Sequence, residues 1–150
     1  MRVVVDSGLV RRPRFDPVTG MNRLEHVRIS RASADQRQGR AGRLGPGVCY
    51  RLWSEAAQRS LAPFTPPEIT EADLAPLALE LAGWGVRDAA TLKWLDPPPP
   101  ALLASARDLL GRLGALDDDA RITRHGRDMA RLSVHPRVAH MLLRAHQLGA

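Results

Sequence analysis

The stretch that organises this sequence is rich in arginine and glycine and reads Ser33-Ala34-Asp35-Gln36-Arg37-Gln38-Gly39-Arg40-Ala41-Gly42-Arg43-Leu44-Gly45. It predicts a short helix, because Ser33 can cap the first backbone N–H groups and Gln36 completes a capping box. Gln36, Arg40 and Arg43 would then share one face of a 3.6-residue period. The two inner glycines each cost a helix about 1 kcal/mol relative to alanine, which indicates that a ligand approaches the backbone closely. An amide and two guanidiniums suit a polyphosphate, since arginine offers forked donors and stays charged.

A solvated basic helix is the alternative, because runs of charged residues usually face water. The order of the residues favours a ligand site. The run Gln36-Arg37-Gln38-Gly39-Arg40-Ala41-Gly42-Arg43 resembles QRxGRAGR, the sixth motif of DEAH-box helicases in superfamily 2. Other stretches are similar to this family in the same order, namely Val3-Val4-Val5-Asp6-Ser7-Gly8, Ile29-Ser30-Arg31-Ala32-Ser33, Pro66-Pro67-Glu68-Ile69, Trp94-Leu95-Asp96-Pro97-Pro98 and Leu116-Asp117.

Within that family the sequence is most similar to the bacterial HrpB type. The stretches that carry this closer resemblance are Asp6-Ser7, Arg14-Phe15-Asp16, Thr19-Gly20 and Leu44-Gly45-Pro46-Gly47. The resemblance implies an arginine-finger element that reaches ATP across a cleft between two RecA-like domains. It implies catalytic roles for Arg40, Arg43 and Gln36, with Arg43 as the first choice of finger, and ATP-binding roles for Gln36, Gly39, Arg40 and Arg43.

The sequence lacks the other half of such an ATPase site. It has no GxxxxGK[ST] loop and no DExH box, and its one lysine, Lys93, does not follow a glycine-rich loop. We therefore expect a C-terminal fragment of an ATP-dependent RNA helicase that neither binds ATP well nor hydrolyses it alone. ATP with Mg²⁺ is the implied cofactor, and the metal ligands are expected on the missing N-terminal helicase domain, which is itself an expected partner.

Residues 9–16 and 21–29 have the composition of two strands joined by the turn Pro17-Val18-Thr19-Gly20. In the helicase family a hairpin at this place projects from the second RecA-like domain toward nucleic acid. The resemblance therefore implies that RNA or another single strand is bound by Arg11, Arg12, Arg14 and Arg23. An ordinary solvated hairpin is the alternative, because single strands are gripped best by interleaved aromatic side chains and this hairpin has one, Phe15.

The fold class that we predict is α/β plus α. By resemblance, residues 1–61 form the C-terminal part of a second RecA-like helicase domain, 62–70 a linker, 71–133 a winged-helix-like domain and 134–150 the start of a ratchet-like helical domain. The β-branched run Val3-Val4-Val5 suits a buried parallel strand, and no partner strand fits before it, which is typical of a fragment. Helix signals in the second part are the leucine period from Leu74 to Leu81, Pro97 to Pro100, Thr123 and Pro136.

Charge is distributed unevenly along the chain. Residues 1–60 contain 12 basic and 5 acidic side chains, a net charge of +7, whereas residues 61–150 contain 10 basic and 11 acidic ones, a net charge of −1. A polyanion would therefore bind to the first part of the chain.

The alternative function is a free-standing winged-helix module that binds nucleic acid or regulates without catalysis. Three consecutive aspartates, Asp117 to Asp119, would repel phosphate from its wing. An interaction-only role for the last helix is a third hypothesis.

The cysteine count and the hydropathy limit which other classes of protein the sequence fits. Cys49 is the single cysteine, so the sequence has neither a disulfide framework nor a cysteine metal cage. The five histidines follow no HExxH pattern, and we expect no metal site. No apolar run approaches the 18 residues that indicate a membrane span. We expect a soluble, cytoplasmic protein with no membrane partner; the sequence does not fix its oligomeric state.

Overall fold

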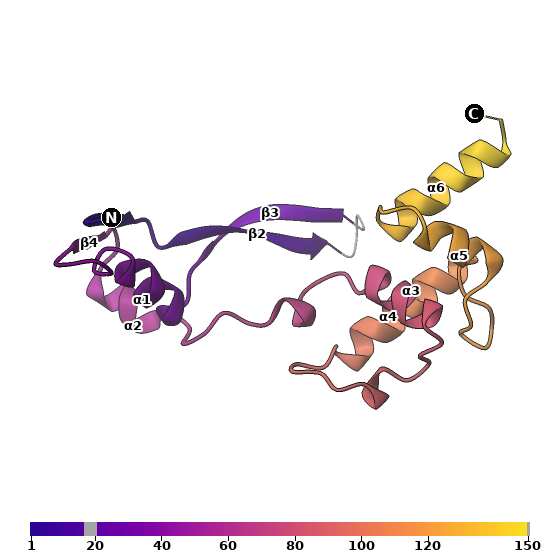
Figure 1. The fold of residues 1–150 in the computed structure, drawn as a ribbon, viewed down its shortest axis with the longest axis horizontal. Coiled ribbons are helices and arrows are strands. Elements are labelled where there is room, and N and C mark those ends of the chain that lie inside the picture. Colours follow the sequence, from indigo (N-terminus) through magenta and orange to yellow (C-terminus); the bar gives the residue numbers. More distant parts are fainter. Residues whose placement is uncertain (17–20, 150) are drawn as a thin grey trace. The chain divides into compact units, whose positions relative to one another are not determined.

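The computed structural model describes residues 1–16 and 21–149. The chain divides into two compact units, unit 1 (Met1–Pro67) and unit 2 (Glu68–Ala150). Unit 1 contains β1 (Val3–Asp6), β2 (Leu9–Asp16), β3 (Met21–Arg28), α1 (Arg31–Gly39), β4 (Val48–Arg51) and α2 (Glu55–Ser60) (Figure 1). Unit 2 contains the 3-10 turns η1 (Glu68–Thr70) and η2 (Ala89–Thr91) and the helices α3 (Ala75–Gly83), α4 (Pro100–Arg112), α5 (Arg124–Ala130) and α6 (Pro136–Gln147).

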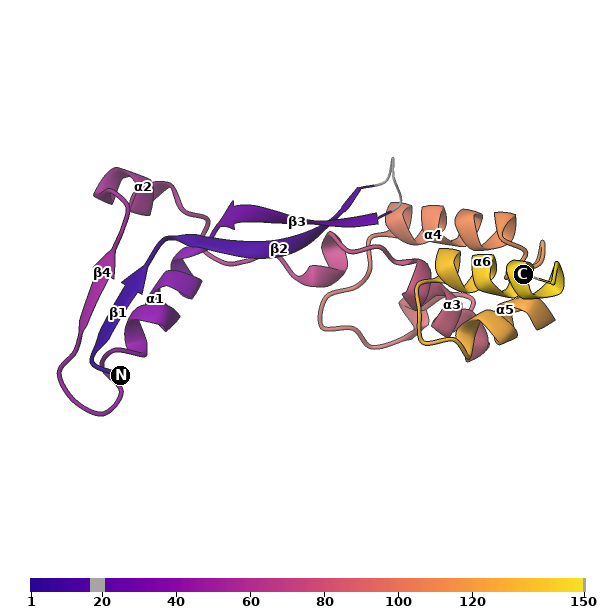
Figure 2. The same cartoon turned by 90° about the horizontal axis from the view of Figure 1, so that it is seen from above.

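The strands β1 and β4 form a parallel two-stranded sheet in which Val3 pairs with Val48 and Val5 with Tyr50. Figure 2 shows the two strands side by side, with α1 next to β1. Because alternate residues face opposite sides of a sheet, these four side chains share one side, and they are between 50% and 64% exposed. The predicted parallel strand is present, but the prediction that it is buried is wrong for this face. The helix α1 packs against β1.

The strands β2 and β3 form an antiparallel hairpin, in register from Leu9–Arg28 to Asp16–Met21. The predicted turn Pro17-Val18-Thr19-Gly20 lies outside the described residues. At the base of the hairpin the N–H of Ile29 donates to the carbonyl of Gly8 at 3.0 Å. Gly8 has a φ of +72°, and a Cβ there would lie 2.8 Å from the Trp53 ring. Glycine therefore meets two needs at this turn, the left-handed backbone and the close approach of the ring.

The helix α1 starts earlier than the sequence pattern predicted. Its N-cap is Ser30, whose hydroxyl accepts a hydrogen bond from the N–H of Ser33 at 3.1 Å, so the prediction that Ser33 is the cap is wrong. The first two N–H groups of the helix donate to the carbonyls of Ala62 and Pro63, at 2.8 and 3.1 Å. These distant carbonyls satisfy donors that a helix otherwise leaves unpaired, and they fix the start at Arg31.

The same helix also ends earlier than predicted. Gly39 is its last residue, and Arg40 caps it with a backbone N–H directed to the carbonyls of Arg37 and Gln38. Residues 41–45 form turns and bends. Arg43 is therefore outside the helix, and the prediction that Gln36, Arg40 and Arg43 share one helical face is wrong. The two glycines explain the early end, because each weakens a helix by about 1 kcal/mol.

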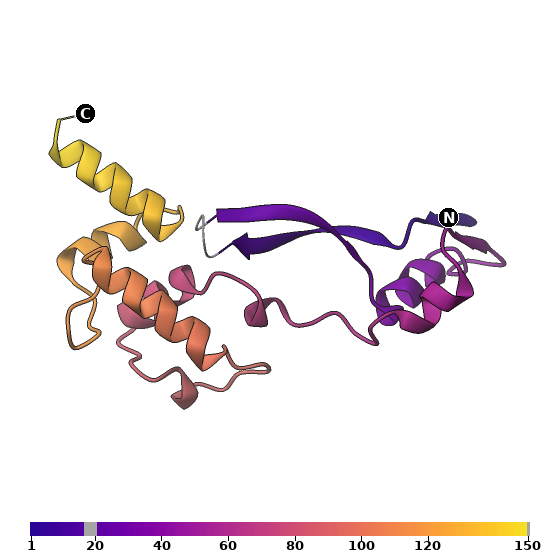
Figure 3. The same ribbon diagram turned by 180° about the vertical axis from the view of Figure 1, so that it is seen from behind.

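The helices of unit 2 enclose a single hydrophobic core, and Figure 3 shows α3 to α6 from the side opposite to Figure 1. Its buried members are Leu74, Ala75, Ala78, Leu79, Leu81, Ala89, Leu103, Ala106, Leu109, Leu110, Ala115, Leu116, Met129 and Ala139. The predicted helix signals are confirmed: Pro100 begins α4, Thr123 caps α5 and Pro136 begins α6. Between α4 and α5 the chain turns back on itself, and Leu116 and Ile122 form one antiparallel bridge.

The C-terminal helix packs within unit 2. Ala139 is fully buried in the core, and Nε2 of His135 lies 2.7 Å from a carboxylate oxygen of Asp73. The chain divides after Pro67, whereas the four expected domains with their boundaries stay predictions. None of the helices in the described part of the chain is long and apolar enough to cross a membrane.

Candidate functional site

The candidate site is the end of α1 and the loop that follows it. Gln36 lies on α1, Arg40 caps the helix and Arg43 lies in the loop. All three side chains are exposed, and none forms a hydrogen bond or ion pair within residues 1–16 and 21–149. A Cβ placed on Gly39 or Gly42 would meet no atom within 4 Å. The structure therefore presents an amide, two free guanidiniums and open space above two glycines.

Both ends of this loop are held by close backbone packing. Ala41 is buried at 3% exposure, and a Cβ on Gly47 would collide with the carbonyl oxygen of Ala41. The next residue, Val48, donates its N–H to the carbonyl of Arg2 at 2.8 Å and so starts β4. The loop of residues 41–47, which carries Arg43, thus returns to the sheet at Val48. Glycine is required at position 47, where the loop meets the backbone of Ala41.

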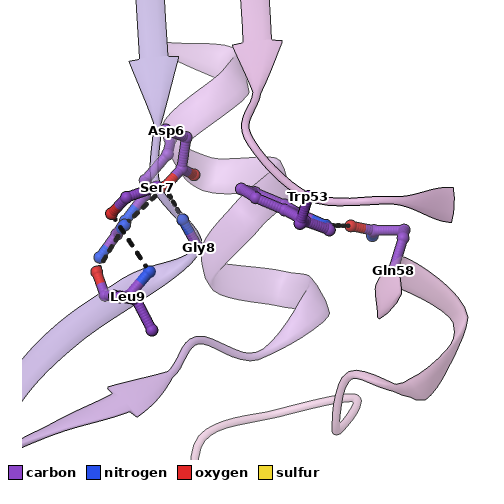
Figure 4. Close-up of polar contacts among 7 residues, drawn as sticks. Asp6, Ser7, Gly8, Leu9, Trp53 and Gln58 are labelled. Atoms are coloured by element: carbon purple, nitrogen blue, oxygen red, sulfur yellow. Dashed lines mark hydrogen bonds and ion pairs between the residues drawn. The ribbon is translucent and has the colours of Figure 1, made fainter. Parts of the chain in front are cut away.

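The arginine of the motif that precedes the two glycines is not free. Nη1 of Arg37 contacts Oδ1 of Asp6 at 2.8 Å and the carbonyl oxygen of Leu9 at 3.2 Å. Asp6 is 3% exposed, and its Oδ1 also accepts the N–H of Gly8 at 2.9 Å. Figure 4 shows this turn, with Asp6, Gly8 and Leu9 together. These contacts hold the turn between β1 and β2.

A second arginine–acid contact holds the opposite side of α1. Nη2 of Arg51 bonds Asp35 at 2.8 Å and the side-chain oxygen of Gln38 at 2.7 Å. The same guanidinium lies 5.8 Å from the centre of the Trp53 ring, whose indole N–H donates to Gln58 at 2.8 Å (Figure 4). The motif therefore divides into side chains that fasten α1 to its own unit and side chains that face solvent.

The hairpin separates the four arginines predicted to bind nucleic acid. Arg14 pairs across the strands with Arg23, and alternation puts Arg12 on their face and Arg11 on the other. Two acids share the face of Arg14 and Arg23, because Arg14 contacts Glu25 at 3.5 Å and Arg23 contacts Asp16 at 3.7 Å. These carboxylates offset the repulsion between like charges placed directly opposite.

The opposite face of the hairpin carries free cations. Arg11 pairs with His26, and Arg28 lies at the base opposite Leu9; both arginines are exposed and, in the described segments, have no polar partner. Arg28 lies on the second predicted strand of the hairpin, but it is not among the four arginines predicted from the sequence to bind nucleic acid. The sequence does contain a pattern that indicates it, because Arg28 and His26 are two residues apart and therefore lie on one face of a strand.

A separate cluster of titratable groups lies in unit 2, around a surface depression of about 460 Å³ lined in part by Arg112, His125, His140 and Arg144. Nε2 of His125 and Nδ1 of His140 are 2.9 Å apart, so one ring donates to the other. Burial lowers the pKa of His125; the nearby His140 and Arg144 lower it further, whereas Asp128 raises it. No residue predicted for the site belongs to this cluster. In the described ranges, no group of three acidic, histidine or cysteine side chains could hold a metal ion.

Comparison with known proteins identifies relatives over almost the whole chain, although no family model matches. The ATP-dependent RNA helicase HrpB of Escherichia coli is 45% identical over 145 residues, which is 97% of this chain and 18% of that protein. DHX34 of Mus musculus is 43% identical over 143 residues, 95% of this chain and 12% of that protein. A crystal structure of the Escherichia coli DEAH/RHA helicase HrpB superposes with a TM-score of 0.87 at 45% identity, covering 95% of this chain and 18% of that one. The chain thus spans less than a fifth of each relative's length.

Proposed function

Because the chain is homologous to a segment of the DEAH-box ATP-dependent RNA helicases, we propose that it supplies the arginine-finger element of such an enzyme. One observation carries this proposal. Of the polar side chains in the motif, Arg37 and Gln38 bond to the unit itself, while Gln36, Arg40 and Arg43 are left exposed and unpaired among the described residues. Leaving two guanidiniums unpaired beside open glycines suits a ligand that brings its own negative charge.

The proposed chemistry is stabilisation of charge during phosphoryl transfer. Such transfer depends mainly on positioning and on donors aimed at the γ-phosphoryl oxygens. Arg43, on the loop, is the finger; Arg40 binds the same phosphate, and Gln36 holds the phosphate or the attacking water. Mg²⁺ bound with ATP would neutralise phosphate charge, and its ligands are expected on the preceding helicase domain, as the resemblance implies.

A site divided between two domains explains how hydrolysis is linked to movement. The phosphate-binding loop and DExH box are expected on a preceding RecA-like domain, and residues 1–61 are proposed to be the C-terminal part of the second. ATP then draws the two domains together over the phosphate. Residues 71–133 are proposed as a winged-helix-like domain and 134–150 as the start of a ratchet-like domain. We place the complete enzyme in the cytoplasm.

RNA or another single strand is the proposed nucleic-acid partner of the hairpin. Support comes from the concentration of charge, since residues 1–60 carry a net +7, and from the free guanidiniums of Arg11 and Arg28 on one hairpin face. Arg12, Arg14 and Arg23 are proposed to contribute from the other face, where Glu25 and Asp16 reduce the positive potential. The competing function, a free-standing winged-helix module, gains no support from residues 61–150, whose net charge is −1.

The test is the replacement Arg43→Ala in the full-length helicase that contains this segment. Loss of an arginine finger should lower RNA-stimulated ATP hydrolysis by roughly 10³-fold or more, measured as kcat in a steady-state phosphate-release assay. Arg59→Ala is the matched control, because Arg59 is an exposed arginine of the same unit at the end of α2. Near-normal hydrolysis by Arg43→Ala would overturn the finger assignment. The 150-residue chain alone should show no ATP hydrolysis above buffer.

A further inference from the structure

One guanidinium joins three elements of unit 1 that are separate in sequence. Nη1 of Arg37, on α1, bonds Asp6 at the end of β1 and the carbonyl of Leu9 at the start of β2. Neither contact is local, because the residues are 31 and 28 positions apart in the sequence. The loop of residues 40–47, called here the finger loop because it carries Arg40 and Arg43, follows α1 directly. The hairpin of β2 and β3, which is proposed to bind nucleic acid, starts at Leu9. A single side chain therefore connects the two parts of the unit to which ligands are assigned.

Burial makes this contact hard to replace. The side chain of Asp6 is 1% exposed and that of Arg37 is 31% exposed. A carboxylate that is removed from water needs a counter-charge, since an unpaired buried charge is strongly unfavourable. Among the described residues Arg37 is the one cation that Asp6 contacts. The position of α1 is therefore tied to the turn between β1 and β2.

The carboxylate also has an unused acceptor. Oδ2 of Asp6 is buried and has no hydrogen-bond partner in the described part of the chain, while Oδ1 is shared by Arg37 and the N–H of Gly8. Arginine binds a carboxylate best through two parallel N–H groups. A forked grip on both oxygens is thus open to Arg37 if the guanidinium turns away from the carbonyl of Leu9. The structure shows the arrangement that holds the hairpin base, and the forked grip would release it.

We propose that Arg37 is a positioning residue that couples the finger loop to the hairpin, so that nucleotide at Arg40 and Arg43 alters the grip of the hairpin on RNA. The inference rests on the proposed function for its two ligands, whereas the link itself is a property of this chain. Because coupling between two sites is reciprocal, RNA on the hairpin also alters nucleotide affinity through the same side chain. The contacts that the structure gives Arg37 are all within unit 1, so it is assigned to neither ligand.

The link is tested first in the 150-residue chain by hydrogen–deuterium exchange. Arg37→Gln should raise exchange both at residues 9–12 of β2 and at residues 40–44 of the loop, and Arg37→Lys should restore part of the protection. Arg31→Gln is the control, since Arg31 is an exposed arginine of the same helix, and unit 2 is an internal reference. If exchange rises at one of these segments without the other, or at neither, the link is overturned.

The coupling is tested in the full-length helicase through binding. The dissociation constant of a short labelled poly(U) strand is measured with and without a non-hydrolysable ATP analogue. In Arg37→Gln the ratio of the two dissociation constants should move toward 1 by about fivefold or more, which is the lower range of typical coupling. The dissociation constant measured without nucleotide should stay within a factor of about two of the wild-type value. A role in stability alone would change both constants together and leave the ratio unaltered, which would overturn the proposal.

The two tests also separate this inference from the proposed function. A wild-type helicase that binds neither the analogue nor poly(U) refutes the proposed function, and the exchange experiment then still decides whether Arg37 links α1 to the hairpin. A wild type that binds both ligands with a ratio of 1 refutes the coupling, even where exchange confirms the link. The double variant Asp6→Asn with Arg37→Gln should resemble Arg37→Gln alone, because the two side chains act as one contact.

Discussion

Unit 1 and unit 2 are held together in different ways. Unit 2 collects its buried leucines, alanines and Met129 in one continuous core. The described part of unit 1 buries four apolar side chains, Ile29, Ala34, Ala41 and Leu61, and relies on polar contacts such as Arg37 with Asp6 and Arg51 with Asp35. The difference indicates that unit 2 is specified mainly by packing, whereas polar contacts have a larger share in unit 1 and leave Arg40 and Arg43 exposed.

The largest effect expected from this difference is a loss of stability in unit 2. Leu110 is fully buried, and Leu110→Ala should lower the free energy of unfolding by about 2–5 kcal/mol, from lost transfer energy and the cavity that remains. Leu102→Ala is the matched control, because Leu102 lies on the same helix and is 40% exposed. Urea denaturation monitored by hydrogen exchange should show that the loss of stability lies in unit 2. Equal losses in both variants would show that α4 packs differently.

A smaller effect is expected in the finger loop of unit 1. Gly47→Ala should disturb the return of the loop to β4, at a cost of about 1–3 kcal/mol typical of overpacking, because its Cβ would collide with the carbonyl of Ala41. Gly42→Ala has open space around its Cβ and should keep the stability of the chain. Thermal unfolding by circular dichroism measures both. A stable Gly47→Ala chain would mean that the loop is free to move.

Nucleic-acid binding should respond to the two faces of the hairpin unequally. Arg11→Gln removes a free cation, so the slope of log K against log salt for single-stranded RNA should fall by about 0.7. Arg14→Gln should reduce the slope less, since Arg14 already contacts Glu25 at 3.5 Å. Fluorescence anisotropy of the full-length helicase over a salt series gives both slopes. A larger effect for Arg14→Gln would assign binding to the other face.

The smallest effect expected is a pH dependence confined to unit 2. Burial and the neighbouring His140 and Arg144 lower the pKa of His125 below its ordinary 6.5. The folded state therefore binds its proton less readily than the unfolded state, so stability is complete above pH 6.5 and declines as the pH falls through the lowered pKa. His125→Gln should weaken this acid sensitivity in melting curves, whereas His146→Gln, at an exposed position, should retain it. Identical curves for both variants would refute the assignment.

The sequence predicted unit 2 better than the site. Proline, glycine and the leucine period mark helix ends and faces locally, and α4, α5 and α6 begin where those signals lie. The cap of α1 was predicted wrongly because two serines, Ser30 and Ser33, can both cap. Their choice depends on carbonyls about 30 residues away in sequence.

By its resemblance the motif predicted Arg40 and Arg43 as site residues, with Arg43 as the first choice, and gave Arg37 no role. The chemistry of the side chains gives no reason for that choice, because Arg37, Arg40 and Arg43 are equivalent donors. The fold distinguishes them, because Asp6 lies beside Arg37 and leaves the other two exposed. The sequence likewise does not divide the hairpin arginines into two faces, since the face on which each one lies depends on strand register.

The contact of Trp53 with the Gly8 turn gives the molecule a native optical probe. The indole lies 2.8 Å from the position that a Cβ on Gly8 would take, and the guanidinium of Arg51 lies over its ring. Its emission should therefore report a shift of that turn without any attached dye. The other two tryptophans, Trp84 and Trp94, belong to unit 2. Trp84 is 69% exposed, and Trp94 donates to the carbonyl of Ala89 at 2.7 Å. Replacing these two by phenylalanine would leave Trp53 as the single tryptophan, close to the Gly8 turn and to α2.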